Sequence, residues 1–195
     1  MANSLIDFKK ALLGGGARPN LFQVNIPDFP GNEPVSGSDA AGDFTMLVKG
    51  TSLPESTLGL VEIPFRGRTF KVAGDRTFAP WSITVINDTD FSIRTAMENW
   101  AQLIAQYADG SGFTNPGSYM RTATVTQLTR AKSAPNDVVD GGLAGVKTYK
   151  FFDIWPTSIS AIDLSYDSSD VIEEFTVEFQ VNYWAPAEIS GGPLN

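Results

Sequence analysis

Apolar and polar residues alternate along several short stretches of the chain, which is the pattern of half-buried β-strands. The clearest stretch spans residues 171–184, where every second side chain is apolar and the intervening ones are polar. The apolar set is Phe175, Val177, Phe179, Val181 and Tyr183, and the polar set is Thr176, Glu178, Gln180 and Asn182. This stretch is therefore predicted to be a strand with one face in the core and one face in water.

Similar patterns predict further strands and the turns between them. The strands cover residues 21–26, 43–49, 62–72, 120–128, 147–155 and 159–166, and another begins at Trp81. Gly67 interrupts the third of these, which predicts a bend or bulge, and residues 72–76 predict a tight turn. Pro156 is expected to end a strand because proline cannot donate to a sheet ladder. Residues 27–42 and 133–145 are predicted loops.

One stretch has helical periodicity instead. Its apolar residues recur at spacings of three or four, which places them on one face of an α-helix. They are Ile93, Met97, Trp100, Ile104 and Tyr107. Residues 88–90 supply possible N-caps, and residues 109–112 are expected to end the helix. The predicted fold is mainly β with this one packed helix: a β-sandwich or partly open barrel of about seven to nine strands.

The length and composition favour a single packed domain over residues 1–195. Apolar residues make up 42% and charged residues 18%, which suits a globular core. Residues 1–17 are predicted to be a flexible arm, because a short apolar stripe of Leu5, Phe8 and Leu12 precedes three glycines. Such an arm is expected to dock on its own domain or on a neighbour. Residues 185–195 are predicted to be a tail.

The composition excludes several kinds of chemistry. The chain has no cysteine and no histidine, which removes disulfides, thiolate chemistry, Ser-His-Asp triads and the usual zinc sites. Its net charge of −8 disfavours tight binding to nucleic acid, because an acidic surface gains nothing from counterion release. Because the chain has no apolar run of the length needed to span a membrane and no signal-peptide pattern, it is expected to be made in a cytoplasm.

The acidic residues do not form a recognisable catalytic or metal-binding motif. Glu173 and Glu174 are neighbours on a predicted strand, so their side chains point to opposite faces and cannot share a proton. The aspartates within residues 163–170 lack the spacing of a calcium loop. Residues 142–148 depart from a phosphate-binding loop, because a valine separates glycine from lysine. No catalytic residue, cofactor or metal is expected. A monomeric ligand-binding β-protein and a carboxylate enzyme such as a glycosidase stay open as alternatives.

The densest basic stretch contains Arg66, Arg68, Lys71 and Arg76. It could be a nucleic-acid patch, a solvated strand edge or an interface with another subunit. The interface is favoured, because the rest of the chain is acidic and arginine pairs well with carboxylates between subunits.

Several segments, taken in order, resemble the tail tube proteins of T4-like contractile phages. They are residues 18–22, 49–54, 65–68, 72–76, 81–87 and 153–156. No single segment is diagnostic, but their order and spacing cover most of the chain.

The resemblance implies a structural subunit and not an enzyme. Copies would form hexameric rings whose strands complete an inner barrel, and stacked rings would form a tube that conducts DNA into the host. The implied partners are other copies of the chain, the tail sheath protein, the baseplate tube initiator, the tape measure protein in the lumen, and phage DNA in transit without tight binding. The location would be the virion, after synthesis in the host bacterial cytoplasm. The tube of a DNA-free particle, such as a pyocin or type VI secretion system, is the alternative.

Three sets of residues receive expected roles. The candidate ring-stacking loop is Thr51, Ser52, Leu53, Pro54, Glu55, Ser56 and Thr57. The candidate subunit interface is the basic set Arg66, Arg68, Lys71 and Arg76. The candidate lumen-lining residues are Thr122, Thr124, Thr126, Glu178, Gln180 and Asn182, because a polar strand face can line a wet channel. The charge of Glu178 is expected to reduce the sticking of DNA.

Overall fold

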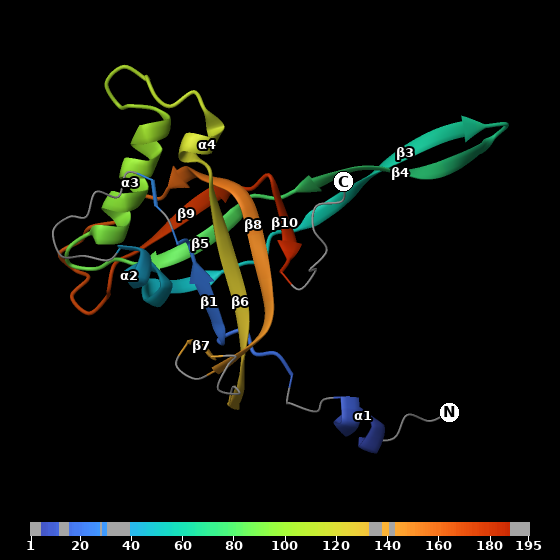
Figure 1. Cartoon of the computed structure of the whole chain (residues 1–195), viewed down its shortest axis with the longest axis horizontal. Coiled ribbons are helices and arrows are strands. Elements are labelled where there is room, and N and C mark those ends of the chain that lie inside the picture. The colour runs from blue at the N-terminus through green and yellow to red at the C-terminus, as the bar shows by residue number, and fades with distance from the viewer. Residues whose placement is uncertain are drawn as a thin grey trace. The chain divides into compact units, whose positions relative to one another are not determined.

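The computed structural model describes residues 5–11, 16–27, 29–30, 40–132, 138–140 and 143–187. The chain is mainly β, as predicted, and its described part contains more helix than expected (Figure 1). The helices are α1 (Leu5–Ala11), α2 (Ala40–Leu47), α3 (Ser92–Ile104) and α4 (Pro116–Tyr119). The strands are β1 (Phe22–Asn25), β2 (Val48–Thr51), β3 (Ser56–Phe65), β4 (Arg68–Phe78), β5 (Trp81–Ile86), β6 (Arg121–Lys132), β7 (Val138–Asp140), β8 (Leu143–Ile159), β9 (Glu174–Gln180) and β10 (Tyr183–Pro186).

The chain forms two compact units. The first contains residues 1–24, 124–150 and 185–195, and the second contains residues 25–123 and 151–184. Strands β6 and β8 each run from one unit into the other. No helix within the described ranges is long and apolar enough to cross a membrane.

The sheet of the second unit has the strand order β8-β9-β5-β2, and its described pairs are antiparallel. The predicted alternation is confirmed on its two central strands, whose apolar side chains are buried on one face. They are Trp81, Ile83 and Val85 on β5 and Phe175, Val177 and Phe179 on β9. The register places Ile83 opposite Val177, so the two apolar rows lie side by side and form the floor of the core.

Trp81 is the centre of an aromatic cluster in this core. Its ring stacks on Phe151 of β8 at 4.8 Å between centroids and lies 5.4 Å from the ring of Phe179. Its indole Nε1 donates a 2.8 Å hydrogen bond to Thr51 Oγ1. The tryptophan therefore buries a large apolar surface without leaving a polar atom unpaired.

Helix α3 packs its apolar stripe against the same core. Ile93, Met97 and Trp100 are buried, as the helical spacing predicts. The Trp100 ring lies 5.7 Å from that of Phe179, and its Nε1 donates to the backbone oxygen of Tyr119 at 2.7 Å. The helix thus contacts β9 through the rings of Trp100 and Phe179 and through Arg94 over the ring of Phe175, and Trp100 anchors the short helix α4 by its hydrogen bond.

The two ends of α3 agree only partly with the prediction. Asp88, in the predicted capping segment, accepts hydrogen bonds from the N–H and the hydroxyl of Ser92. The helix ends at Ile104, before the predicted stop at residues 109–112. Tyr107 consequently lies beyond the helix and is exposed, so its predicted place on the apolar face is wrong.

Residues 43–49 do not form the predicted strand. Most of this stretch belongs to α2, which begins within the predicted loop of residues 27–42, and only the strand β2 follows. Phe44 and Val48 are buried, whereas Met46 between them is 70% exposed. Phe44 lies in α2 and Val48 in β2, and a strand would have placed Met46 on the same buried face as both, so tertiary packing overrides the alternation of these residues.

The predictions around Pro156 are also wrong. Strand β8 continues through this proline to Ile159, and the β8–β9 register shifts between Pro156 and Ser158. A proline at a bulge leaves no ladder bond unmade, which explains why the strand does not end there. Residues 160–173 contain no strand, although 159–166 were expected to form one, and Tyr166 in this loop is fully exposed.

In the first unit the strand order is β1-β6-β8, and β7 and β10 also pair with β8. Val24 and Leu128 are buried, and the Leu128 N–H donates to Leu21 O at 2.9 Å. The described part of the predicted arm is the helix α1, whose Leu5 and Phe8 are exposed. Leu12 and the glycines at 14 and 15, part of residues 133–145 and most of the predicted tail lie outside the described residues.

We expect the change Trp81→Ala to lower the free energy of unfolding by about 3–5 kcal/mol, because it removes the ring on which two other rings pack. Urea denaturation of the monomeric chain measures this change. The control is Tyr107→Ala, at an exposed tyrosine, which should change stability by less than about 0.5 kcal/mol. A similar loss for the two variants would contradict the central place of Trp81 in the core.

Candidate assembly interface

Strands β3 and β4 form a long two-stranded hairpin that projects from the rest of the second unit (Figure 1). The chain reverses at Arg66 and Gly67, whose φ angles are 45° and 80°. Positive φ at both central residues is the geometry of the tight turn that matches the twist of paired strands, and glycine adopts it without strain. The predicted bend at Gly67 is therefore a complete chain reversal.

The predicted tight turn at residues 72–76 is wrong, because this segment lies inside β4. The register shifts here, so that Gly59 on β3 faces both Gly74 and Asp75 on β4. A Cβ built on Gly59 would lie 3.2 Å from Asp75 O, and one built on Gly74 would lie 3.1 Å from the carbonyl carbon of Gly59. The two glycines thus let the strands approach closely at a β-bulge, which bends the hairpin.

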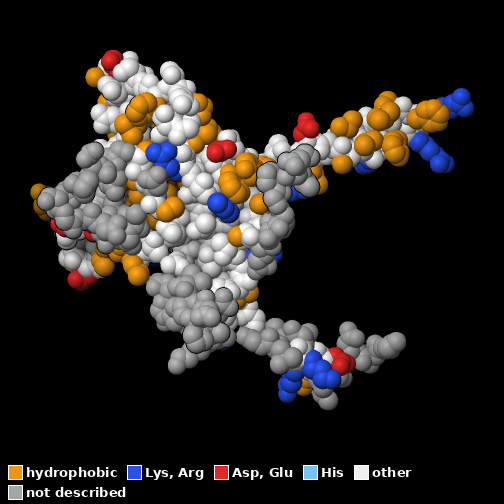
Figure 2. Space-filling model, in the orientation of Figure 1, with side chains coloured by type: hydrophobic (Ala, Val, Ile, Leu, Met, Phe, Trp, Pro, Cys, Tyr) orange, Lys and Arg blue, Asp and Glu red, His pale blue; other side chains and the backbone are white. Residues whose placement is uncertain are grey.

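The hairpin exposes apolar side chains on both of its faces. Leu60 and Val61 are neighbours and so point to opposite faces, yet they are 58% and 50% exposed. The same is true along the length of the element, where Figure 2 shows a row of hydrophobic side chains. The exposed set is Leu58, Leu60, Val61, Ile63, Phe65, Phe70 and Val72. A contiguous apolar surface of this kind marks an interaction site.

The four basic residues of the candidate subunit interface all lie on this hairpin. Figure 2 shows Lys and Arg side chains at its end, where the turn contains Arg66 and β4 begins with Arg68. Lys71 faces Glu62 across the strands at 3.5 Å, and Arg76 lies nearer the base. Because these groups are exposed, the internal ion pair contributes little to stability, and the charges at the tip stay available to a partner.

The candidate ring-stacking loop leads into the hairpin. Thr51 ends β2, and its hydroxyl accepts the hydrogen bond from the indole of Trp81. Pro54 is buried. Residues 52, 53 and 55 are exposed, and Ser56 and Thr57 begin β3. The Ala79 N–H donates to Glu55 O at 3.0 Å, which closes the base of the hairpin. The predicted loop is thus a short connection, and the larger projecting element follows it.

The polar face of the central sheet holds part of the candidate lumen set. Glu178 is exposed on β9 opposite Ser82 of β5, and next to them the hydroxyls of Thr84 and Thr176 lie 3.4 Å apart. Sequence reasoning missed Ser82 and Thr84, although they are the polar half of the alternation that it used to identify this strand. Gln180 is half-buried at the end of β9, and Asn182 just beyond it is exposed.

The threonines of the candidate lumen set are less accessible. Thr122 and Thr124 on β6 are half-buried. Thr126 is only 8% exposed, and its hydroxyl lies 3.0 Å from that of Thr148. In the isolated chain Thr126 therefore faces its own unit and not open solvent.

The described residues hold no cluster of three or more carboxylates that could bind a metal ion. Hydrogen bonds from the hydroxyl and the N–H of Ser111 lower the pKa of the Asp109 carboxyl. This pair shapes the loop after α3 and lies outside the hairpin. The arrangement of the hairpin is suited to association.

Comparison with known proteins gives concordant matches. Residues 17–186 match a family model described as phage tail tube protein. The tail tube protein gp19 of Enterobacteria phage T4 is 32% identical over 172 residues, which are 88% of this chain and 92% of that protein. A tail tube protein of Serratia phage KSP90 is 27% identical over 176 residues, covering 89% and 92% of the two chains.

Solved structures share the fold at low sequence identity. A chain of the PVC sheath-tube complex, from an extracellular contractile injection system, has a TM-score of 0.58 and 13% identity, with 91% of this chain and 95% of that chain covered. A chain of the anti-feeding prophage baseplate has a TM-score of 0.55 and 11% identity, with 88% and 95% covered.

We expect the backbone amides of β3 and β4 to exchange with solvent much faster than those of β5 and β9 in a dilute solution of the isolated chain. The reason is that a two-stranded hairpin without a third strand or a core is marginally stable, whereas β9 has a partner strand on either side. Hydrogen exchange followed by mass spectrometry measures the difference. Equal protection of the four strands would show that the hairpin is stable without a partner.

Proposed function

Since the chain belongs to the phage tail tube protein family, we propose that it assembles with copies of itself into hexameric rings, which stack into the hollow inner tube of a contractile phage tail. Membership of this family makes the chain a structural component of the virion and not an enzyme. Family membership alone does not establish the hexameric ring, the stacking of rings or the passage of DNA through the tube, and these three are what we propose.

The observation that carries this proposal is the hairpin with two apolar faces. Covering one side chain of the size of Leu or Phe contributes about 1.5–3 kcal/mol, so several uncovered side chains are a strong drive to association. A neighbouring copy is present at the same concentration as the chain itself and offers the same surface in every subunit. Repeated contact between copies explains why a soluble chain would retain this hairpin.

The roles of the individual residues follow from their places on the hairpin. We place Arg66, Arg68, Lys71 and Arg76 at contacts between subunits, because they accompany the exposed apolar residues. The connection 51–57 would contact the next ring, since it lies at the base of the projecting element. The anti-feeding prophage structure is described as 6-fold symmetrised, which supports a hexameric ring as the expected stoichiometry.

The polar face of β5 and β9 is the proposed lining of the lumen. Neighbouring copies would continue this sheet and complete an inner barrel, with Glu178 and the surrounding hydroxyls facing the channel. Carboxylates along such a channel repel DNA and keep it from adhering as it passes into the host. The threonines of β6 join this lining only if assembly exposes them.

The remaining partners follow from the place of a tube in a contractile tail. The outside of the tube would contact the sheath, and its first ring would sit on a baseplate initiator. The PVC structure that shares the fold is a sheath-tube complex, and another comes from a baseplate, which supports both contacts. The tape measure protein and then DNA would occupy the lumen, and the subunit would be made in the cytoplasm of the host bacterium.

The test of assembly is electron microscopy of the purified chain at several concentrations, with and without changes to the hairpin. We expect rings or tubes from the natural sequence and none from the triple variant Leu60→Ser, Ile63→Ser, Phe70→Ser, because this variant removes apolar surface that assembly would bury. The matched control is Phe113→Ser, which changes an exposed aromatic residue outside the hairpin and should still form tubes. Tubes from the triple variant would contradict the proposal.

We expect Glu178→Lys to leave tube formation intact and to reduce infectivity, because a positive charge in the lumen would retain DNA. Plaque assays on phage carrying the variant, together with microscopy of their tails, measure the two effects separately. Asp90→Lys makes the same charge change in the loop before α3 and should keep infectivity. Normal infectivity of the Glu178 variant would count against its place in the lumen.

A further inference from the structure

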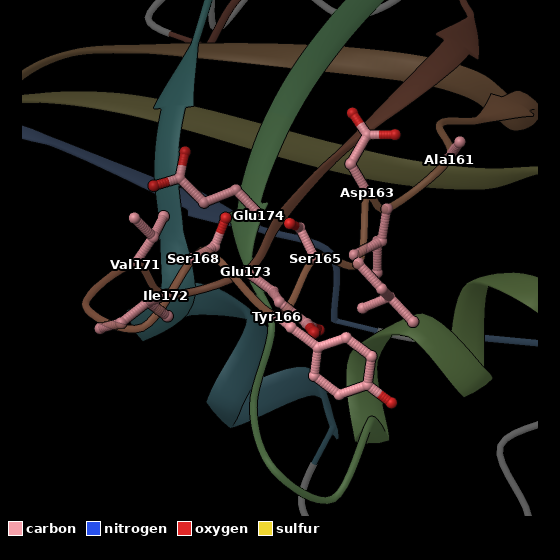
Figure 3. Close-up of a pocket in the computed structure, with 11 residues that line it drawn as sticks. Ala161, Asp163, Ser165, Tyr166, Ser168, Val171, Ile172, Glu173 and Glu174 are labelled. Atoms are coloured by element: carbon pink, nitrogen blue, oxygen red, sulfur yellow. The ribbon is translucent and has the colours of Figure 1, made fainter.

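The loop of residues 160–173, between β8 and β9, encloses an open groove of about 730 Å³. Figure 3 shows Val171 and Ile172 on one side of the groove and Asp163 on the other. Val171 and Ile172 are 74% and 68% exposed, and Leu164 of the same loop is 79% exposed. The lining of the groove therefore includes exposed apolar side chains beside polar ones, and in the isolated chain nothing among the described residues covers it.

The same segment is strongly acidic. Residues 161–174 carry five carboxylates and no lysine or arginine; they are Asp163, Asp167, Asp170, Glu173 and Glu174. Glu174 forms a salt bridge with Lys49, and Glu173 accepts a hydrogen bond from Asn87. None of the salt bridges in the described part of the chain involves the three aspartates. The groove thus combines exposed apolar side chains with the carboxylate of Asp163, and Asp167 and Asp170 lie in the same loop, where they are available to a basic partner.

We propose that this groove receives the tip of the β3–β4 hairpin from a neighbouring copy of the chain. This inference rests on the proposed function, and it names the surface that covers the hairpin. The tip complements the groove in both respects, because it carries the apolar Phe65 and Phe70 together with Arg66 and Arg68. Arginine and carboxylate form strong, oriented hydrogen bonds, which would fix the depth of insertion.

A chain cannot fill its own groove with its own hairpin. The hairpin and the loop of residues 160–173 lie at opposite ends of the second unit (Figure 1). Each copy therefore offers a hairpin in one direction and a groove in the other, which makes the contact head-to-tail. Contacts of this kind generate closed rings when the rotation closes and open filaments when it does not.

Helix α1 is the competing occupant of the groove. It exposes Leu5 and Phe8 and ends with Lys9 and Lys10, so it is also apolar and basic. The hairpin is favoured because its tip, residues 63–70, carries two arginines and no carboxylate beside exposed apolar residues, whereas α1 carries two lysines beside Asp7. A disulfide test distinguishes the two occupants.

The absence of cysteine in the natural sequence allows a site-specific disulfide test. One chain carries Arg68→Cys on the hairpin, a second carries Ser168→Cys in the groove, and the two are mixed, assembled and oxidised. We expect a disulfide-linked dimer that forms in the mixture in far higher yield than in either variant alone. Mixing Lys9→Cys with Ser168→Cys tests α1 in the same way and should give only the background yield.

A second pair, Thr69→Cys with Ser165→Cys, leaves Arg68 in place. It keeps the test valid if the loss of Arg68 in the first pair prevents assembly. Tubes without dimers from both pairs would overturn the hairpin–groove contact and leave the proposed function intact. A high yield from the α1 pair in place of the hairpin pairs would overturn it too and would assign the groove to α1. Failure of the natural sequence to form rings or tubes would instead overturn the proposed function itself.

Discussion

The uncovered apolar surface of the β3–β4 hairpin is the constraint that distinguishes this chain from a protein that is complete as a monomer. A hairpin packed on its own core would hide one face, but this one exposes both. Two strands alone bury too little surface to be stable in water. The chain nevertheless specifies the element firmly, through the tight turn at Arg66 and Gly67 and the glycine contact at the bulge. The local sequence sets the shape of the hairpin, and its stability must come from another surface.

The central sheet and α3 could be predicted because each has only one buried face. Strict alternation in β5 and β9, and spacings of three or four in α3, leave no second structure that buries the same side chains. The projecting hairpin could not be predicted in this way. Its side chains are exposed on both faces, so the alternation of apolar and polar residues does not show which face is buried. The predicted strand at residues 43–49 is wrong for a different reason. Phe44, Met46 and Val48 alternate as in a strand, but only Phe44 and Val48 are buried, and the helix that replaces the strand depends on packing that the sequence does not display.

The candidate interface was only partly predictable, and the difference is again physical. Composition showed that Arg66 and Arg68 stand out in an acidic chain, and the structure places them together at one tip. The acidic loop gives no such signal, because its aspartates lack the spacing of a metal site and its apolar residues fit the pattern of a strand. Their joint exposure in one loop becomes visible only in the structure, where β8 ends at Ile159 and residues 160–173 form no strand. Complementarity between two distant segments is a tertiary property.

The core stabilises the fold of the single chain, and the hairpin surface is available for association. This separation explains how such a chain can fold before it assembles. The aromatic cluster of Trp81, Phe151 and Phe179 holds the second unit together without any contribution from the hairpin tip. Folding and association therefore use separate sets of side chains, so one can proceed before the other. The net charge of −8 keeps free chains apart, whereas the basic tip is the part of the hairpin that an acidic neighbour attracts. In the proposed hairpin–groove contact, attraction would be confined to one oriented surface, so growth by addition of copies would be favoured over unspecific aggregation.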